Sequence, residues 1–273
     1  MITSAWARAA LRVWVGLVIA FLFIPIVLIV VYAFNTSNIE SWPIAGLTMK
    51  WFSVAWHDSE VRSAFVLSLK AGFVATGIAL VLGSLAAFGI HRFRFFGRES
   101  ISLILVLPLA LPGIITGMAL NAFFTFNGIS FSLWTIVVGH ATFCIVVVYN
   151  NVIARLRRTS ASFVEASADL GASGWQTFRF ITLPTTATAL VAGALLAFAL
   201  SFDEVIVTVF TAGAQNTLPL WIFGAIRLGQ RLPEVNVVVF AVILLTLVPL
   251  AVAARLTGGT GLSAAPTTSD RAT

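Results

Sequence analysis

Residues 165–184 read EASADLGASGWQTFRFITLP and form a polar stretch between two long apolar runs. The order of the residues, and not only their polarity, indicates a defined structure. Gly171 is the residue type that most readily ends a helix in the left-handed conformation, so it predicts a corner in the middle of the stretch. Pro184 lies where the next apolar run begins, and a proline costs little in the first turn of a helix, where its missing N–H is not needed.

Two capping boxes divide this stretch into two short helices. Ser162 with Glu165 fits the first box, and Ser173 with Gln176 fits the second. In such a box the serine hydroxyl and the side chain three residues later satisfy backbone amides that the first helical turn leaves free. The second helix is expected to run through Phe180. The stretch therefore predicts two helices that meet at a glycine corner.

The first of these helices is expected to expose small and apolar side chains. They are Phe163, Val164, Ala166 and Ala168. An apolar helix face of this kind fits the groove of a partner protein. It is equally compatible with an amphipathic helix that rests on lipid.

The composition excludes a soluble protein. Apolar residues make up 59% of the 273 residues and charged residues only 10%, whereas charged residues are about 25% of a soluble domain. Mean hydropathy is +1.02. The chain is therefore predicted to be an all-α integral membrane protein. Its single cysteine, Cys144, lies in an apolar run, which argues against a disulfide framework or a thiol metal cluster.

Six apolar runs are long enough to cross a hydrocarbon layer of about 30 Å as helices. They cover residues 14–34, 64–90, 100–124, 131–153, 186–209 and 236–256. We therefore predict a six-span domain over residues 14–256, in which the loop at 155–185 is the structured one. A tail at residues 1–13 precedes this domain. A disordered tail rich in Gly, Ser, Thr and Ala follows it at residues 257–273.

Basic residues are distributed unevenly between the two sides of the membrane. If the N-terminus is cytoplasmic, the larger set lies on that side: Arg8, Arg12, Arg92, Arg94, Arg98, Arg155, Arg157, Arg158, Arg179, Arg255 and Arg271. The outer set is Lys50, Arg62, Arg227 and Arg231. The positive-inside rule therefore places both termini and the structured loop in the cytoplasm. The same rule accounts for the net charge of +6, so nucleic acid is not an expected partner.

Helix-breaking and polar residues mark the third and fourth runs. Pro108 and Pro112 predict a kink in the third run, because each proline removes a backbone hydrogen bond. Gly113 and Gly117 are spaced for close contact with another helix. The kinked run suits either the lining of a pathway or ordinary packing. Asn121 and His140 are expected to form hydrogen bonds across helices.

Asp203 and Glu204 are the most costly residues of the chain to place in a membrane. They lie about 17 residues into the fifth run, roughly 25 Å from its cytoplasmic end. Charge at that depth is expensive unless it faces water or a partner. One interpretation is contact with a substrate, and for a cation the rings of Phe202 and Trp221 would contribute. The alternative is a structural ion pair with one of three basic residues, Lys70, Arg227 or Arg231.

The structured loop resembles the signature E-A-A-x3-G-x9-I-x-L-P of the permease subunits of bacterial ABC importers, the binding-protein-dependent type I class. The matching positions are Glu165, Ala166, Gly171, Ile181, Leu183 and Pro184, while Ser167 replaces the usual second alanine. In that family the loop is the coupling helix, seated in a cleft of a separate ATP-hydrolysing subunit. The resemblance implies that these seven residues form the ATPase-coupling site, with Glu165 and Gly171 most important for docking.

Other segments resemble the spermidine/putrescine permease subfamily of second-subunit type. These segments are Ser68-Leu69-Lys70-Ala71, Ser201-Phe202-Asp203-Glu204, Thr217-Leu218-Pro219 and Pro233-Glu234-Val235-Asn236. Importers for ferric iron, thiamine or sulfate share parts of these motifs. The resemblance therefore implies polyamine import by alternating access, with a different solute as the alternative.

The same resemblance implies the partners and the location. They are two ATPase subunits, a second homologous permease, an extracytoplasmic solute-binding protein and the lipid of a prokaryotic inner membrane. The chain has no phosphate-binding loop of the G-x-x-x-x-G-K-[ST] type, so ATP is expected to be used by the partner and no cofactor by this chain. No metal-binding or nucleophile motif appears, which indicates a protein that is not an enzyme. A proton-coupled secondary transporter with Asp203 or Glu204 as the proton site is the rival hypothesis.

Overall fold

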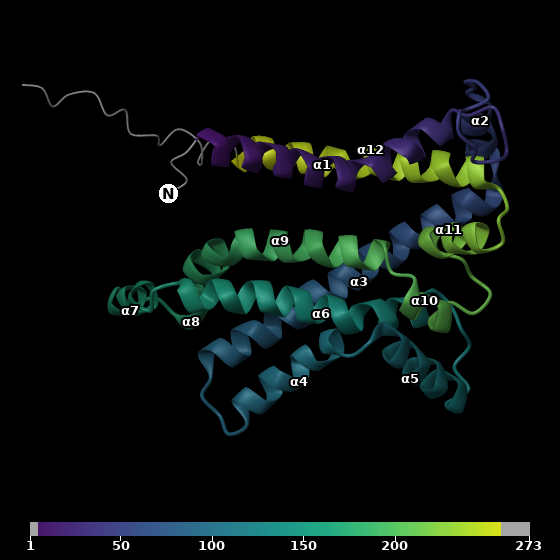
Figure 1. Cartoon of the computed structure of the whole chain (residues 1–273). Coiled ribbons are helices and arrows are strands. Elements are labelled where there is room, and N and C mark those ends of the chain that lie inside the picture. Colours follow the sequence, from purple (N-terminus) through teal and green to yellow (C-terminus); the bar gives the residue numbers. More distant parts are fainter. Residues whose placement is uncertain (1–4, 258–273) are drawn as a thin grey trace, which may run out of the picture. The chain divides into compact units, whose positions relative to one another are not determined.

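The computed structural model describes residues 5–257, and in them every regular element is a helix (Figure 1). The elements are α1 (Ala5–Ala33), α2 (Lys50–His57), α3 (Ser59–Arg92), α4 (Arg98–Ala110), α5 (Gly113–Phe126), α6 (Leu133–Arg158), α7 (Ser162–Asp169), α8 (Gly174–Thr177), the π-helical turn η1 (Phe178–Thr182), α9 (Leu183–Phe202), α10 (Ile206–Thr211), α11 (Leu218–Arg227) and α12 (Leu232–Thr257). A single isolated β-bridge, between Asn35 and Leu47, is the only strand-like pairing in this part of the chain. The all-α prediction is confirmed.

The chain divides into two units. The first contains the described residues up to Asp58 and those from Ala225 onward, and the second is Ser59–Gly224. Helix α1 begins at Ala5, so the helix extends into the tail expected at residues 1–13. The disordered tail expected at residues 257–273 lies, from residue 258 on, outside the described residues.

In the first unit, α1 and α12 lie side by side and α2 packs on α12 (Figure 1). Three phenylalanines connect these helices, because the ring of Phe34 lies 5.0 Å from that of Phe52 and 5.9 Å from that of Phe240. The side-chain amide of Asn236 donates to the Glu40 carboxylate at 2.6 Å. Apolar stacking and a part-buried polar contact thus fix the segment before α2 against α12.

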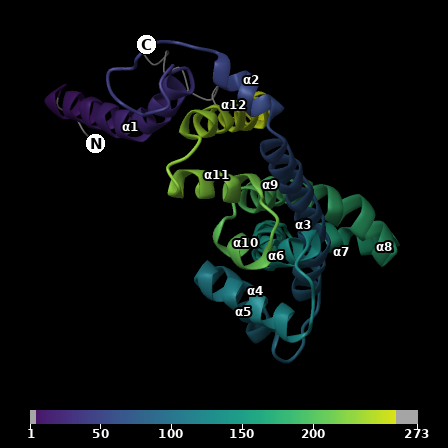
Figure 2. The same ribbon diagram turned by 90° about the vertical axis from the view of Figure 1, so that its right-hand side faces the viewer.

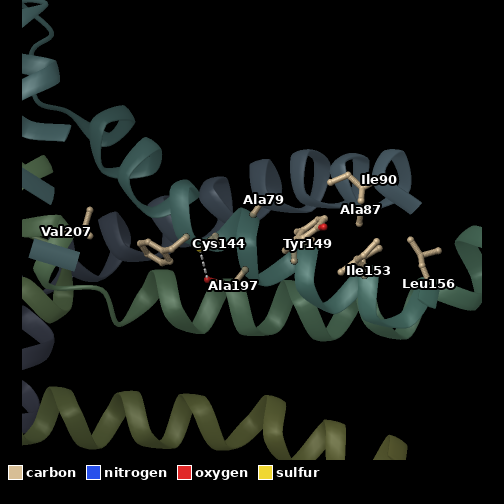
Figure 3. Packing of buried hydrophobic residues seen from close by; sticks show 12 residues of the cluster. Ala79, Ala87, Ile90, Cys144, Tyr149, Ile153, Leu156, Ala197 and Val207 are labelled. Atoms are coloured by element: carbon tan, nitrogen blue, oxygen red, sulfur yellow. Dashed lines mark hydrogen bonds between the residues drawn. The ribbon is translucent and has the colours of Figure 1, made fainter. Parts of the chain in front are cut away.

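In the second unit, α3, α6 and α9 pack together along their length, as the two views show (Figures 1 and 2). Helix α6 supplies most of the buried side chains in one core cluster, among them Cys144 and Tyr149, which face α9 and α3 (Figure 3). The Cys144 thiol donates to the carbonyl of Ala197 at 3.3 Å. Gly83 permits the close approach of α3, since a β-carbon there would lie 2.8 Å from the carbonyl oxygen of Ile145.

Four described segments are long and apolar enough to cross a membrane. They are Ala5–Ala33, Ser59–Arg92, Leu133–Arg158 and Gly174–Phe202. Helices α4 and α5 together could form one more, but they are bent by 100°. The last apolar helix qualifies only as the shorter segment Leu232–Leu247. A helical membrane fold with several spans is therefore present, while the number six is not directly confirmed.

The expected kink in the third run is a complete break. Leu111 follows α4 in an extended conformation, with ψ of 141°, and Pro112 precedes α5. The reason is steric, because the ring of a proline disfavours the helical conformation of the residue before it. The two halves, α4 and α5, diverge from this point (Figure 1).

The fifth run differs from its expected bounds of 186–209. The helix is continuous from Gly174 to Phe202, and residues 206–211 form the separate helix α10. The prediction of one span through residue 209 is therefore wrong. The helix is interrupted at residues 203–205. There the Glu204 carboxylate accepts a hydrogen bond from the Val207 amide at 2.9 Å, and this local contact starts a new helix.

Candidate functional sites: the coupling loop and the acidic break

The loop at residues 155–185, called the coupling loop below, begins with a helix that lacks the expected cap. Helix α7 has Ala161 as its N-cap residue and no side-chain cap, so the Ser162–Glu165 capping box is wrong. Ser162 is already the first helical residue, and its amide instead donates to the Ser160 hydroxyl at 3.3 Å. The Glu165 side chain is consequently not used in capping and is exposed.

The corner at Gly171 is confirmed. Its φ of +78° is left-handed. The amide of Ala172 donates to the carbonyl of Ser167 at 3.0 Å, and the amide of Gly171 donates to that of Ala168 at 2.9 Å. These two bonds define a Schellman motif, which satisfies the last carbonyls of α7. A β-carbon at Gly171 would have no atom within 4 Å, so the backbone conformation, rather than lack of space, requires glycine.

The second capping box is confirmed, but the helix that it starts does not end at Phe180. The Ser173 amide donates to the Gln176 side chain at 2.7 Å, and the Gln176 amide donates to the Ser173 hydroxyl at 3.4 Å. The helix continues through η1 into α9, and Pro184 lies in the first turn of α9. The wider π-helical turn accommodates the proline ring and the missing N–H, so the chain does not have to break.

A pair of buried hydroxyls joins the two helical segments of the loop. The Oγ of Ser167 lies 2.9 Å from the Oγ1 of Thr177, and both residues are buried. Each hydroxyl also lies within hydrogen-bonding distance of a carbonyl of its own segment, that of Val164 or that of Ser173. Sequence analysis did not identify Thr177, because a partner ten residues away leaves no local pattern.

The outer surface of the coupling loop is apolar. Leu170 is 89% exposed and Phe180 is 71% exposed. With Phe163 and Ile181 they line a groove of about 520 Å³ between the two helical segments. Of the seven residues matched to the signature, Ser167 is buried, Ile181 and Leu183 are half-buried, and Glu165, Ala166, Gly171 and Pro184 are exposed. Four of the seven, Ala166, Ser167, Gly171 and Ile181, line this groove, whereas Glu165 lines a separate cavity.

Basic side chains surround the inner side of the coupling loop. A cavity of about 470 Å³ is lined by Glu165 together with His91, Arg92 and Arg157. In the described part of the chain, Glu165 forms no salt bridge.

Asp203, Glu204 and Val205 form a second site, the acidic break, between α9 and α10. Asp203 is the C-cap residue of α9 and is exposed. Glu204 is half-buried because its carboxylate accepts from the Val207 amide. The expectation that both carboxylates lie within a continuous span is therefore wrong. Asp203 instead stands at the negative end of the α9 dipole, where a carboxylate is disfavoured by about 0.3–1 kcal/mol and a cation is favoured.

The structural ion pair expected as the alternative role of this acidic pair is absent from the described residues. Arg231 forms ion pairs with Asp58 and with Glu234, the latter at 2.6 Å. Neither Asp203 nor Glu204 forms a salt bridge with a basic group in the part of the chain that the structure describes.

Long-range hydrogen bonds hold α10 in place. The Asn121 side chain donates to the carbonyl of Phe210 at 2.7 Å, and the Thr135 hydroxyl donates to that of Thr211 at 2.8 Å. His140 lies 2.7 Å from the Ser201 hydroxyl and 2.8 Å from the Thr208 hydroxyl. The predicted cross-helix bonds of Asn121 and His140 are confirmed. Sequence analysis did not identify Thr208, although a hydroxyl four residues after Glu204 is a possible signal for it.

Small residues let α10 approach its neighbours. A β-carbon at Gly117 would lie 2.6 Å from the ring of Phe210, and one at Gly139 would lie 3.0 Å from Val207. A β-carbon at Gly113 would be in ordinary contact with Ile206, at 3.6 Å. The prediction of close helix contact is confirmed for Gly117, whose partner is α10, while Gly113 also faces α10 but does not require a glycine there.

The two aromatic residues expected beside the carboxylates differ in accessibility. Phe202 is half-buried next to Asp203, with its ring 5.9 Å from that of Phe198 and 6.4 Å from that of Phe65. Trp221 lies on α11 and is only 7% exposed. Phe202 is thus near the acidic break, whereas the Trp221 side chain is enclosed by the protein.

The helical membrane fold and the coupling loop define a permease component of an ABC importer. The family of binding-protein-dependent transport system inner membrane components matches residues 79–258, and the chain belongs to this family. It is 34% identical over 232 residues to the spermidine/putrescine transport system permease protein PotC of Haemophilus influenzae, covering 84% of this chain and 89% of that protein.

Two further comparisons agree. The chain is 35% identical over 225 residues to the putrescine transport system permease protein PotI of Escherichia coli, covering 79% of each. Its fold is similar to a solved bacterial ABC transporter involved in the import of the acidic polysaccharide alginate, with a TM-score of 0.68 and 16% identity over 95% of this chain and 99% of that one. The chain is therefore a multi-pass membrane translocation subunit, and the hypothesis of a secondary transporter is not retained.

Proposed function

We propose that the chain is the permease of a polyamine importer, with putrescine or spermidine as its solute. The observation that carries the proposal is the acidic break, where the exposed Asp203 carboxylate has no basic partner in the described chain and stands at the negative end of α9. The printed names of PotC and PotI, which concern spermidine and putrescine, support the same solute class.

The chemistry of this break favours a cation over an anion. A primary ammonium group would be attracted by the Asp203 carboxylate and by the free carbonyls at the end of α9. The Phe202 ring beside it offers a face for the methylene chain or for a cation–π contact. Sulfate would meet repulsion from the same groups.

Energy for transport is proposed to come from a separate ATPase that binds the coupling loop. The docking surface would contain Glu165, Ala166, Ser167, Gly171, Ile181, Leu183 and Pro184. Its exposed apolar side chains suit a partner cleft, and Glu165 suits a cationic group in that cleft. This proposal places the loop and both termini in the cytoplasm, in agreement with the distribution of arginines.

The complete importer is proposed to contain two ATPase subunits, a second homologous permease and an extracytoplasmic binding protein. In this assembly residues 14–256 act as one permease domain. Closure of the ATPase pair would move the coupling loops together, and the pathway would then open outward to receive the solute. This chain itself would neither bind ATP nor hydrolyse it.

Uptake into vesicles tests the proposal. The complete transporter, with its ATPase, second permease and binding protein, is reconstituted and supplied with ATP inside the vesicle and labelled spermidine, putrescine or sulfate outside. ATP-dependent uptake of a polyamine, and not of sulfate, is the expected result. Uptake of sulfate without polyamine uptake would reject the solute class. Uptake driven by a pH gradient in the absence of the ATPase would reject the mechanism.

A further inference from the structure

One buried side chain reaches both helices that flank the acidic break. His140, on α6, is 1% exposed. Its Nδ1 lies 2.7 Å from the hydroxyl of Ser201, near the end of α9, and its Nε2 lies 2.8 Å from the hydroxyl of Thr208, on α10. The imidazole therefore bridges the two helices, α9 and α10, on either side of the acidic break. Figure 3 shows α6 and α9 side by side in the adjacent core.

The directions of these hydrogen bonds follow from the next contact in the chain. The Thr208 hydroxyl donates to the carbonyl of Glu204 at 2.7 Å, which uses its only proton. Thr208 must therefore accept from His140, so the imidazole carries its proton on Nε2. The other nitrogen, Nδ1, then accepts from the Ser201 hydroxyl. The network thus requires a proton on Nε2, and a neutral His140 is the Nε2–H tautomer.

We propose that His140 is a positioning residue that fixes the orientation of the acidic break for solute binding. The inference rests on the proposed function, because it concerns how that site is presented to the solute. His140 forms a hydrogen bond with the Thr208 hydroxyl, and that hydroxyl donates to the backbone carbonyl of Glu204. The Glu204 carboxylate in turn accepts from the Val207 amide. Through this chain of contacts the break is tied to α6.

A purely structural role would be shared by the other polar anchors of α10. Asn121 also donates a hydrogen bond to α10, but at Phe210, at the opposite end of this helix from the break. Asn121→Leu is thus a matched control, because it removes one polar anchor of α10 and leaves every contact of the break intact. Only the His140 contacts are expected to affect how the solute is bound.

Two substitutions separate the two contacts of His140. His140→Gln can place an amide N–H near the position of Nε2 and keep the bond to Thr208. His140→Asn reaches only the position of Nδ1 and loses that bond. In the vesicle assay, His140→Asn should raise the half-saturation concentration for spermidine about 5-fold, the loss expected for one buried hydrogen bond. His140→Gln should stay within about 2-fold of the unmodified chain.

A labelling experiment tests the same point without transport. In a Cys144→Ser background, Asp203→Cys provides one thiol at the break, and its reaction rate with a charged thiol reagent is measured in the complete transporter. His140→Asn should change this rate about 5-fold, while Asn121→Leu should leave it unchanged. Thr208→Val removes the same contact and replaces His140→Asn if that variant does not reach the membrane.

The outcomes separate this inference from the proposed function. If His140→Asn changes neither the half-saturation concentration for spermidine nor the labelling rate of the thiol at position 203, the positioning role is overturned. Equal effects of His140→Asn and Asn121→Leu in both assays would overturn it as well, since the contacts would then serve packing alone. If the unmodified transporter does not take up polyamines, the solute proposal fails, and the labelling rates still decide whether His140 orients the break.

Discussion

The coupling loop and the acidic break are both interruptions between helices, but different interactions hold them. In the loop, the Gly171 corner is closed by bonds to Ser167 and Ala168, and the second cap joins Ser173 to Gln176. At the break, His140 contacts Ser201 and Thr208, which lie 61 and 68 positions along the chain. The loop is thus fixed mainly by near neighbours, and the break mainly by distant ones.

This difference suits the two proposed roles. A loop that keeps its shape through local contacts can dock against another protein while the membrane helices shift, because its internal bonds move with it. A break held by α5 and α6 changes its geometry only when those helices move. The geometry of the proposed solute site therefore changes with helix movement, whereas the proposed docking site keeps its internal shape and moves as a unit with the helix that follows it. The four substitutions below test this contrast.

Gly171→Asp should have the largest effect on transport. An aspartate must adopt the left-handed φ of +78°, at about 1–2 kcal/mol, and it places a charge on the docking surface. We expect ATP-dependent uptake to fall about 20-fold or more, because docking of the ATPase is lost. Insertion into the membrane should be unaffected. Co-purification of the ATPase is the measurement.

Gly128→Asp provides the control for that change. Gly128 has a φ of +65° and no atom within 4 Å of a β-carbon, so it reproduces the local strain at a site away from the coupling loop. It should retain the ATPase and most of the uptake. Equal loss of ATPase in both variants would show that strain, and not docking, explains the result.

Asp203→Asn should have the next largest effect. The substitution removes the charge and keeps the size of the side chain, so we expect the half-saturation concentration for spermidine to rise about 10-fold while the protein level changes little. Glu99→Gln, at an exposed carboxylate in the first turn of α4, is the control and should not change uptake. A parallel fall in protein level and uptake for Asp203→Asn would favour a structural role.

Gly117→Ala should reduce stability more than solute binding. Its β-carbon would lie 2.6 Å from the ring of Phe210, so α5 and α10 must separate, at about 1–3 kcal/mol. Thermal unfolding of the purified transporter measures the loss. Gly77→Ala is the helical control, since no atom lies within 4 Å there, and it should be neutral or stabilising by up to about 1 kcal/mol. Equal melting temperatures for the two variants would refute close packing of α5 on α10.

Ser173→Ala should have the smallest effect. It removes the hydroxyl that accepts from the Gln176 amide, at about 1 kcal/mol. Because the helix continues unbroken into α9, we expect faster hydrogen exchange only over the first turn of α8 and nearly normal uptake. Loss of protection along α9 would show instead that the cap supports the whole segment.

The sequence was informative where a structure depends on neighbouring residues. Gly171 as a left-handed stop and the Ser173–Gln176 box were both predictable, because their partners lie within a few positions. The Ser162 box failed for a local reason, since the helix starts one residue earlier than the pattern indicated. Asn121 and His140 were correctly expected to bond across helices, yet their partners could not be named.

The sequence could not reveal the interruption at Glu204. Apolar residues flank Asp203 and Glu204 on both sides, from Leu195 to Phe202 and from Val205 to Val209, so the pattern indicates one span that contains two charges. The helix ends at Phe202 because Glu204 contacts Val207 and because α5 and α6 supply partners for α10. Likewise, Thr177 became visible as the partner of Ser167 only when the two helical segments were folded together.

By itself, the sequence determined that this is an all-α membrane protein with a helical loop that turns at Gly171. Composition and short-range caps depend only on the residues themselves and their near neighbours, and not on the tertiary arrangement. Only the tertiary structure decided where the fifth run is interrupted and that Asp203 is exposed at the end of a helix. It also decided that His140 spans the break. These features depend on side chains that lie far apart along the chain, and only packing brings them within hydrogen-bonding distance.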